Sequence, residues 1–460
     1  MKLIYGVKDK PKAGQLIVFA IQQLLAIMAA TLVVPVIVGH GMQPAAALLG
    51  AGIGTIVYLL FTKFKSPVFL GSSFAFLGSM ATAFAGGVSM ALGYLGLILG
   101  AVLAGLVYVV IALLVKFVGV QWINKLMPAV VIGPTVAIIG LSLAGNAVGD
   151  LQTAPAGGDS KIAILCGLVT LAVTMICSVY SKKKSMLRLI PFIIGILAGY
   201  AVAAIFTVIG NAANVDALKV INFSSITALW DGGVGLKTFI TIPDCTFVTA
   251  LGGFKEFSAG YLGTIAVAYI PVAFVVFAEH IADHKNISSI IETDLLEEPG
   301  LHRTLLGDGV GSMAGAFFGG CPNTTYGESI ACVAITGNAS VVTILCAACL
   351  AILIAFLAPF VAFVNSIPSC VMGGVCMALY GFIAVSGLKM VQKVDLEDNR
   401  NLFVVSVILI AGIGGLSLTF GQITITTVAC ALILGILTNI MLSGKKADKD
   451  TENTENTENK

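Results

Sequence analysis

Residues 322–336 read PNTTYGESIACVAIT and residues 67–76 read PVFLGSSFAF, and these two stretches decide the fold. Each lies in an apolar region long enough for a membrane span, yet Pro, Gly and clustered Ser, Thr or Asn residues prevent an unbroken helix there. Non-helical backbone is tolerated at membrane depth only where it lines a cavity or is buried by protein. Two interrupted segments therefore predict one central site inside a membrane protein.

The composition around these stretches excludes a soluble protein. Of the 460 residues, 58% are apolar and only 10% are charged, against about 25% charged in a soluble domain. A helix crosses the hydrocarbon core with about 20 mostly apolar residues, and about fourteen runs qualify. We expect membrane spans at 15–38, 44–61, 67–85, 91–115, 127–145, 162–180, 188–209, 261–284, 303–319, 322–336, 339–364, 368–388, 401–417 and 423–443.

The two interrupted spans are the third of each group of seven, which indicates an internal repeat. A Pro-x-x-Val-x-Gly pattern at 128–133 opens the fifth span and recurs at 368–373, where the fifth span of the second half begins. An odd number of spans in each half inverts the second half relative to the first, as in many secondary transporters. The predicted fold is an all-α polytopic membrane protein with 14 transmembrane segments in a 7+7 inverted repeat.

The distribution of basic residues predicts the orientation. Lys and Arg collect in cytoplasmic loops, and the fourteen-span topology places 21 of the 25 on the side of the N-terminus. Only Lys161, Lys219, Lys237 and Lys255 fall on the other side. We therefore expect a multi-pass protein of the cell membrane with both termini in the cytoplasm. The polar residues 445–460, which contain a repeated Thr-Glu-Asn triplet, are expected to form a disordered tail.

Two acidic residues lie where a charge is costly. Glu279 follows eighteen residues without a formal charge, and Asp283 lies one helical turn later on the same face. An ionisable group in a span costs about 2.5 to 3.5 kcal/mol and is a functional candidate. The alternative is that residues 279–285 form a cytoplasmic helix end with His280 and His284 at the membrane interface.

The interrupted segments supply the other candidates. Glu328 comes just after the break, where the free N–H groups of a half-helix favour an acceptor, although it could also be a simple capping carboxylate. In the first break, Ser73 and Phe74 offer N–H groups and an aromatic face to a flat ligand, whereas packing is the simpler interpretation of Phe76. For Asp308, which lies among glycines, a packing role and a transport role stay open.

The type of charge indicates the class of ligand. Two carboxylates without a Lys or Arg would repel an anion, so a neutral ligand with N–H donors fits better. An anion transporter of the same architecture remains the rival interpretation. A membrane enzyme with Glu279, His280 and His284 as metal ligands is a second rival, but their order differs from HExxH. We expect no enzyme activity, cofactor, metal or nucleic-acid partner.

Four motifs carry a resemblance to a known family. They are QQLLAIMAATLVVPV at 22–36, LGSSFAF at 70–76, AEH at 278–280, and the stretch 299–336 that contains PNTTYGE. The chain resembles the nucleobase/ascorbate transporter family over about residues 6–442, and within it the bacterial uracil permeases. Their tenth span carries Tyr-Gly-Glu, as at 326–328 here, whereas xanthine and urate carriers typically have Gln in place of the acid.

The resemblance implies a core domain (15–120 and 261–366) and a gate domain (121–210 and 367–444). Residues 1–14 would be a cytoplasmic N-terminus and 211–260 an extracytoplasmic connection, and short extended pieces in segments 3 and 10 would pair between the halves. The implied function is import of uracil, or a close nucleobase relative, by proton symport through alternating access. Xanthine or another nucleobase, sodium coupling and a homodimer stay open.

The resemblance also implies roles for individual residues. Glu279 and Glu328 would accept the ring N–H groups, Phe74 would stack on the ring, and Tyr326 would shape the pocket. Backbone contacts would come from Ser73, Phe74, Gly327 and Glu328. Glu279, alone or with Asp283, would carry the coupled proton.

The chain departs from the family pattern at four positions. Gln23 and Asp283 stand where the family commonly has His, and Ser329 and Ala331 stand where it usually has Asn and Gly. These departures leave open how the site is held together.

Overall fold

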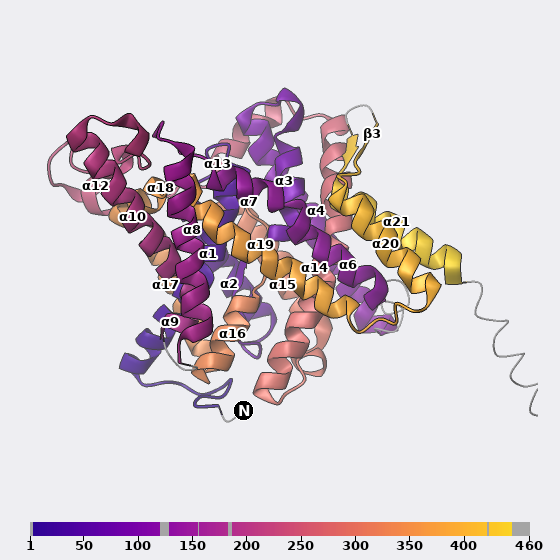
Figure 1. The fold of residues 1–460 in the computed structure, drawn as a ribbon. Coiled ribbons are helices and arrows are strands. Elements are labelled where there is room, and N and C mark those ends of the chain that lie inside the picture. The colour runs from indigo at the N-terminus through magenta and orange to yellow at the C-terminus, as the bar shows by residue number, and fades with distance from the viewer. Residues whose placement is uncertain (1–2, 120–127, 155, 183–185, 421–422, 444–460) are drawn as a thin grey trace, which may run out of the picture.

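The computed structural model describes residues 3–119, 128–154, 156–182, 186–420 and 423–443 (Figure 1). The predicted disordered tail, 445–460, lies outside these residues. Among them, eight helices are long and apolar enough to cross a membrane, and five shorter apolar helices accompany them. The chain is therefore an almost entirely helical, polytopic membrane protein.

Helices cover the predicted spans of the first half. They are α1 (Ala13–Val38), α2 (Pro44–Phe61), α3 (Leu77–Ala83), α4 (Met90–Val118), α6 (Ala129–Ser142), α7 (Ala144–Leu151), α8 (Ser160–Tyr180), α9 (Met186–Leu189) and α10 (Pro191–Ala213). The connection that follows contains short pieces: η3 (Asp216–Leu218), α11 (Ser224–Thr227), α12 (Leu236–Phe239), α13 (Thr246–Ala250) and η4 (Leu251–Lys255).

The second half repeats this order. Its helices are α14 (Ala259–Ile291), η5 (Leu296–Gly300), α15 (Leu301–Gly319), α16 (Gly327–Thr336), α17 (Val341–Ala355), α18 (Ala358–Ser366), α19 (Ser369–Val391), α20 (Asn399–Ile413) and α21 (Thr427–Leu442). A hairpin of β3 (Leu418–Phe420) and β4 (Ile423–Ile425) precedes α21. α14 extends seven residues beyond the predicted end at 284, so the alternative in which residues 279–285 form the end of this helix is wrong.

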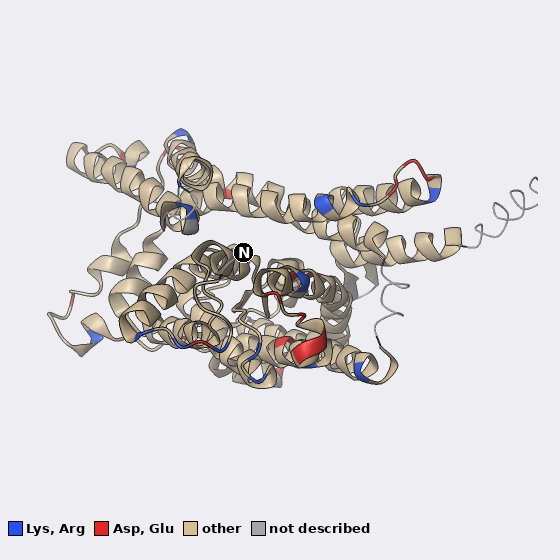
Figure 2. Cartoon of the chain, turned by 90° about the horizontal axis from the view of Figure 1, so that it is seen from below, with Lys and Arg blue, Asp and Glu red and all other residues tan. Residues whose placement is uncertain are grey.

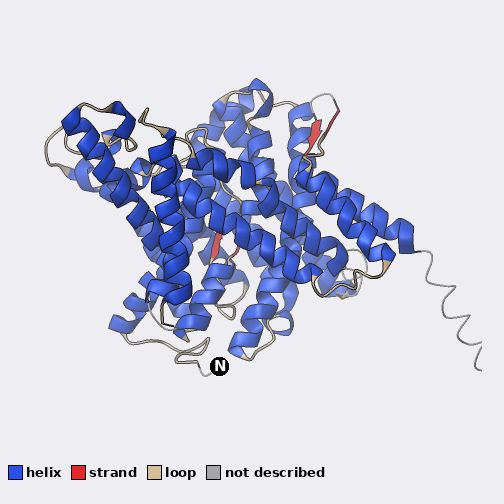
Figure 3. Ribbon diagram, viewed as in Figure 1, coloured by secondary structure: helices blue, strands red, loops and turns tan. Residues whose placement is uncertain are grey.

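Both interrupted segments contain a short strand, as the family resemblance implied. β1 (Leu70–Ser72) and β2 (Asn323–Thr325) pair antiparallel at the centre of the molecule, with Gly71 opposite Thr324 (Figure 3). β1 leads into the half-helix η1 (Phe74–Phe76) and α3, and β2 leads into α16. The pairing satisfies the extended backbone that neither segment could satisfy alone.

The helices form two groups, which Figure 2 shows as two layers. In the first group, α15 packs on α2 and α4, α17 on α1 and α2, and α14 on α4. In the second group, α19 packs on α6 and α8, α20 on α6 and α21, and α10 on α8. Glycines permit close approach: a Cβ atom at Gly50 of α2 would lie 2.4 Å from the carbonyl oxygen of Gly315 in α15.

Candidate functional site

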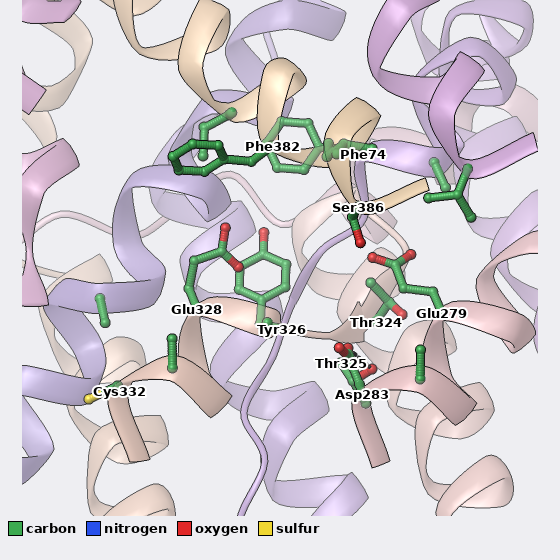
Figure 4. A pocket seen from close by; sticks show the side chains of 18 of the residues that line it. Phe74, Glu279, Asp283, Thr324, Thr325, Tyr326, Glu328, Cys332, Phe382 and Ser386 are labelled. Atoms are coloured by element: carbon green, nitrogen blue, oxygen red, sulfur yellow. Dashed lines mark hydrogen bonds between the residues drawn. The ribbon is translucent and has the colours of Figure 1, made fainter. Parts of the chain in front are cut away.

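A cavity of about 400 Å³ lies between the two groups of helices (Figure 4). The first group lines it with α14, η1 and the β2–α16 break. The second group lines it with α6, α10, α19 and the short helix α9. Its volume is in the range that small-molecule sites occupy.

Three carboxylates line this cavity. Glu279 and Asp283 come from α14, where their spacing of four residues puts them on one face, and Glu328 comes from the first turn of α16. Thr325 donates a hydrogen bond of 2.7 Å from Oγ1 to Oδ2 of Asp283. The acid on α14 is thus tied directly to the strand that precedes Glu328.

The β1–β2 junction shapes the wall beside Glu328. Tyr326 lines the cavity with its ring, while its hydroxyl donates to the carbonyl oxygen of Ser72 at 2.7 Å. Gly71 is required for this arrangement, because a Cβ atom there would lie 2.3 Å from the Tyr326 ring. Gly327 begins α16 at the cavity surface.

Aromatic side chains cover another side of the cavity. Phe74 and Phe382 both project over the space above the carboxylates (Figure 4). The Phe74 ring meets Tyr380 of α19 edge-on, with 6.0 Å between ring centroids. Phe76 is instead buried against Tyr269, with stacked rings 5.5 Å apart, which agrees with the packing role expected for it.

Ser73 is the one predicted site residue that does not line the cavity. It is buried, and its backbone N–H donates to the carbonyl oxygen of Pro322 at 2.9 Å. That N–H therefore closes the strand pairing and is not free for a ligand. The other predicted residues, Phe74, Glu279, Asp283, Tyr326, Gly327 and Glu328, all reach the cavity.

Two of the departures from the family pattern contact each other. Gln23 of α1 donates from Nε2 to Oγ of Ser329, and the backbone N–H of Phe69 donates to the same oxygen at 3.0 Å. Gln23 and Ser329 are both buried. Their hydrogen bond ties α1 to the first turn of α16, next to Glu328. The other two departures, Asp283 and Ala331, line the cavity.

The two histidines of α14 lie behind the site, both 0% exposed. His280 contacts Oδ2 of Asp308 through Nδ1 at 2.7 Å and Thr304 through Nε2 at 3.0 Å. His284 contacts the hydroxyl of Tyr58 at 2.7 Å through Nε2. Both rings are therefore buried among α2 and α15, so the expectation of interfacial histidines is wrong.

The contacts of the two histidines give Asp308 a packing role and argue against a metal site that includes His280 and His284. Asp308 is a buried partner of His280 and does not line the cavity. Among the residues that the structure describes, no group of three His, Cys, Asp or Glu side chains is arranged to hold a metal ion.

The sequence did not identify the residues that the second group contributes. α19 turns one face to the cavity with Leu379, Phe382, Ile383 and Ser386, a helical spacing. Because lipid-facing residues of a span follow the same period, only the packing reveals this face. α9 adds Arg188, so the expectation of a site without Lys or Arg is wrong.

The cavity thus has a polar wall and a mostly apolar wall. The carboxylates, Thr324 and Thr325 come from the first group. The second group contributes mainly aliphatic and aromatic side chains, with Ser386 and Arg188 as its polar residues. This arrangement can accept hydrogen bonds from the edge of a flat molecule and cover its face.

Known proteins are similar to this chain over most of its length. The model of a family described as the Permease family (Xan_ur_permease) matches residues 14–420. The uracil permease of Bacillus caldolyticus is 40% identical over 448 residues, which is 96% of each chain. The uracil permease of Bacillus subtilis (strain 168) is 38% identical over 97% of each chain. The uracil permease of Escherichia coli (strain K12) is 37% identical over 94% of this chain and 92% of that relative.

Solved structures show a similar fold at low sequence identity. The transmembrane domain of the cyanobacterial bicarbonate transporter BicA has a TM-score of 0.63 and 16% identity, over 92% of this chain and 97% of that chain. SLC26A9 has a TM-score of 0.61 and 11% identity, over 94% of this chain and 66% of that chain. At such identities the likeness concerns the fold alone.

Proposed function

This chain belongs to the Permease family, so it is a membrane transport protein and not an enzyme. We propose that it imports uracil, or a close nucleobase relative, together with a proton. The cavity carries this proposal. Uracil is a flat neutral ring with N–H donors and carbonyl acceptors on its edge, and the cavity faces it with Glu279 and Glu328 as acceptors. The relatives named as uracil permeases support the same substrate.

Several residues of the first group of helices have roles in binding the base. Glu279 and Glu328 accept the ring N–H groups, and Phe74 stacks on the ring face. The N–H groups of Phe74, Gly327 and Glu328 lie where two half-helices begin and meet the carbonyl oxygens of the base. Tyr326 is held by its bond to Ser72 and fixes the width of the pocket.

Glu279 carries the coupled proton, alone or with Asp283. The two acids share one face of α14 and one cavity, so a proton on either of them relieves the repulsion between like charges. The hydrogen bond from Thr325 to Asp283 links this proton to the strand before Glu328. Binding of the base at Glu328 and protonation at Glu279 or Asp283 thereby both act on the segment from β2 to the start of α16.

The architecture we propose has fourteen spans in two inverted halves, with a core domain (15–120 and 261–366) and a gate domain (121–210 and 367–444). The helix contacts support it, because they occur in matching pairs. The α1–α17 contact corresponds to α4–α14, and α2–α17 corresponds to α4–α15. Likewise, α8–α10 corresponds to α20–α21, and α8–α19 to α6–α20.

Both termini lie in the cytoplasm in this topology, and the protein resides in the cell membrane. The N-terminus lies at the same end of the molecule as α9 and α16, whose residues line the cavity (Figure 1). Figure 2 views this end and shows Lys and Arg on its loops. If this end faces the cytoplasm, as proposed, α9 and α16 lie on the cytoplasmic side of the cavity. A homodimer is compatible with the family, and the described residues of one chain line the cavity.

The decisive experiment is uptake of labelled uracil into cells that lack their own permease. We expect uptake that a protonophore abolishes, that excess xanthine does not inhibit, and that Glu279→Ala or Glu328→Ala eliminates. Strong competition by xanthine would indicate that the substrate is a purine and not uracil. Normal uptake in both variants would refute the site.

A further inference from the structure

A second cavity of about 320 Å³ lies on the other side of the candidate site. It is lined by α3, by the end of α6, by Val272 of α14, and by Ser417 and 426–428 around the β3–β4 hairpin. Three residues line both cavities: Phe74, Ala75 and Ile139. These residues form a thin partition between the two spaces.

The order of residues along α6 supports this geometry. Val136 lines the first cavity, Ile139 lines both, and Ser142, one turn further, lines the second cavity. The chain from η1 to α3 runs the same way, because Phe74 and Ala75 line both cavities and Ser79 lines only the second. The partition thus consists of one residue on α6, Ile139, and two residues on η1, Phe74 and Ala75.

Three hydroxyl groups that line the second cavity already donate to backbone carbonyl oxygens. Ser79 donates to the carbonyl oxygen of Ala268 at 2.7 Å, Thr82 to that of Gly78 at 2.9 Å, and Ser142 to that of Ile139 at 3.1 Å. Such groups bind a polar ligand poorly, because their hydrogens are committed. Among the described residues, the lining of the second cavity also contains no charged side chain, so we interpret this cavity as a passage.

We propose that Ile139 is a specificity-determining residue, which limits the depth of the substrate site and, with Phe74, seals it from the outer passage. This inference rests on the proposed function, since it concerns the size of the base that the same site accepts. Ile139 is 3% exposed, so its side chain fills the space between the cavities. A purine, which has two fused rings, needs a deeper site than a pyrimidine, which has one. The Ile139 side chain occupies the space that the second ring would need. Its removal joins the site to the passage.

α6 supplies a matched control in the neighbouring residue. Ile138 is also buried, but it packs against Gly412 of α20 and lines neither cavity. Ile139→Ala and Ile138→Ala thus remove the same atoms from the same helix. Ile139→Val, which removes one methyl group, gives a milder variant in case Ile139→Ala does not fold.

The test uses purified protein in proteoliposomes that contain a pH-sensitive dye. We expect Ile139→Ala to increase inhibition of uracil uptake by xanthine about tenfold or more, Ile139→Val to increase it less, and Ile138→Ala to leave it unchanged. Without any nucleobase, Ile139→Ala should acidify the lumen faster than the wild type under an inward proton gradient. Equal behaviour of Ile139→Ala and Ile138→Ala in both assays would overturn the inference.

The two assays separate this inference from the proposed function. If the wild type takes up no uracil, the proposed substrate fails, while the proton leak still tests the partition. If the wild type takes up uracil but the Ile139 variants neither leak nor admit xanthine, only the partition fails.

Discussion

At the scale of single residues, the proposed contact between Glu328 and the base gives the first prediction. A carboxylate only accepts hydrogen bonds, whereas the amide of a Glu328→Gln variant also donates. Hydrogen bonds to charged groups contribute about 1.5 to 3 kcal/mol, so we expect the KM for uracil to rise about tenfold or more. Uptake kinetics at fixed expression measure this. An unchanged KM would show that Glu328 caps α16 without contacting the base.

The hydrogen bond between Gln23 and Ser329 gives a second prediction. Ser329→Ala removes the acceptor of both the Gln23 amide and the Phe69 N–H, which stay buried. A buried polar group without a partner costs about 1 to 3 kcal/mol. We therefore expect lower thermal stability in detergent, and part of the loss should be recovered by the additional change Gln23→Leu.

Ser142→Ala is the control for this prediction. The Ser142 hydroxyl bonds only to its own helix, at Ile139, so its removal should have little effect. If Ser329→Ala and Ser142→Ala melt at the same temperature, the bond between Gln23 and Ser329 does not hold α1 to α16.

At the scale of helices, close packing of α2 on α15 should tolerate no added methyl group. A Cβ atom at Gly50 would lie 2.4 Å from a backbone oxygen, whereas nothing lies within 4 Å of one at Gly149 of α7. Ala is a better helix former than Gly by about 1 kcal/mol. We expect Gly149→Ala to fold as well as the wild type and Gly50→Ala to give much less folded protein by size-exclusion chromatography. Equal yields would contradict the packing.

The sequence predicted helices better than it predicted their faces. Long apolar runs required helices, and Pro67 and Pro322 required breaks, because backbone hydrogen bonds must be satisfied in a bilayer. Glu279 and Glu328 could be singled out because a charge in a span is costly. Ile139 and Phe382 gave no such signal, since an apolar side chain looks the same whether it faces lipid, a neighbouring helix or a cavity.

Contacts between distant segments also decided the positions of Ser73, which we expected to bind the ligand, and of His280, for which the sequence left two interpretations open. Ser73 carries a suitable donor for a ligand, but the antiparallel register commits that donor to Pro322. His280 looked like an interfacial residue until α14 proved seven residues longer and placed it against Asp308. Both outcomes depend on contacts across more than twenty residues of chain, which local sequence does not encode.

At the scale of the whole molecule, the two walls of the cavity indicate which part carries the substrate. Nearly all polar groups lie on one group of helices, and the other offers a mostly apolar surface. A base that is hydrogen-bonded to the polar wall can move with it, because an apolar surface resists sliding little. Under the proposed alternating access, the partition at Phe74 and Ile139 opens while the side that we propose to be cytoplasmic closes.

The energetics of the whole cycle give the last prediction. Moving one proton inward across 100 mV supplies about 2.3 kcal/mol, enough for roughly fifty-fold accumulation of a neutral solute. In sodium-free proteoliposomes at equal pH on both sides, a potassium diffusion potential of that size should therefore drive uracil accumulation towards this ratio. Glu279→Gln should bind uracil more weakly and show no accumulation at all, because the variant lacks the group that we propose as the proton carrier. Accumulation that appears only when sodium is added would assign the coupling to sodium and leave Glu279 as a substrate ligand alone.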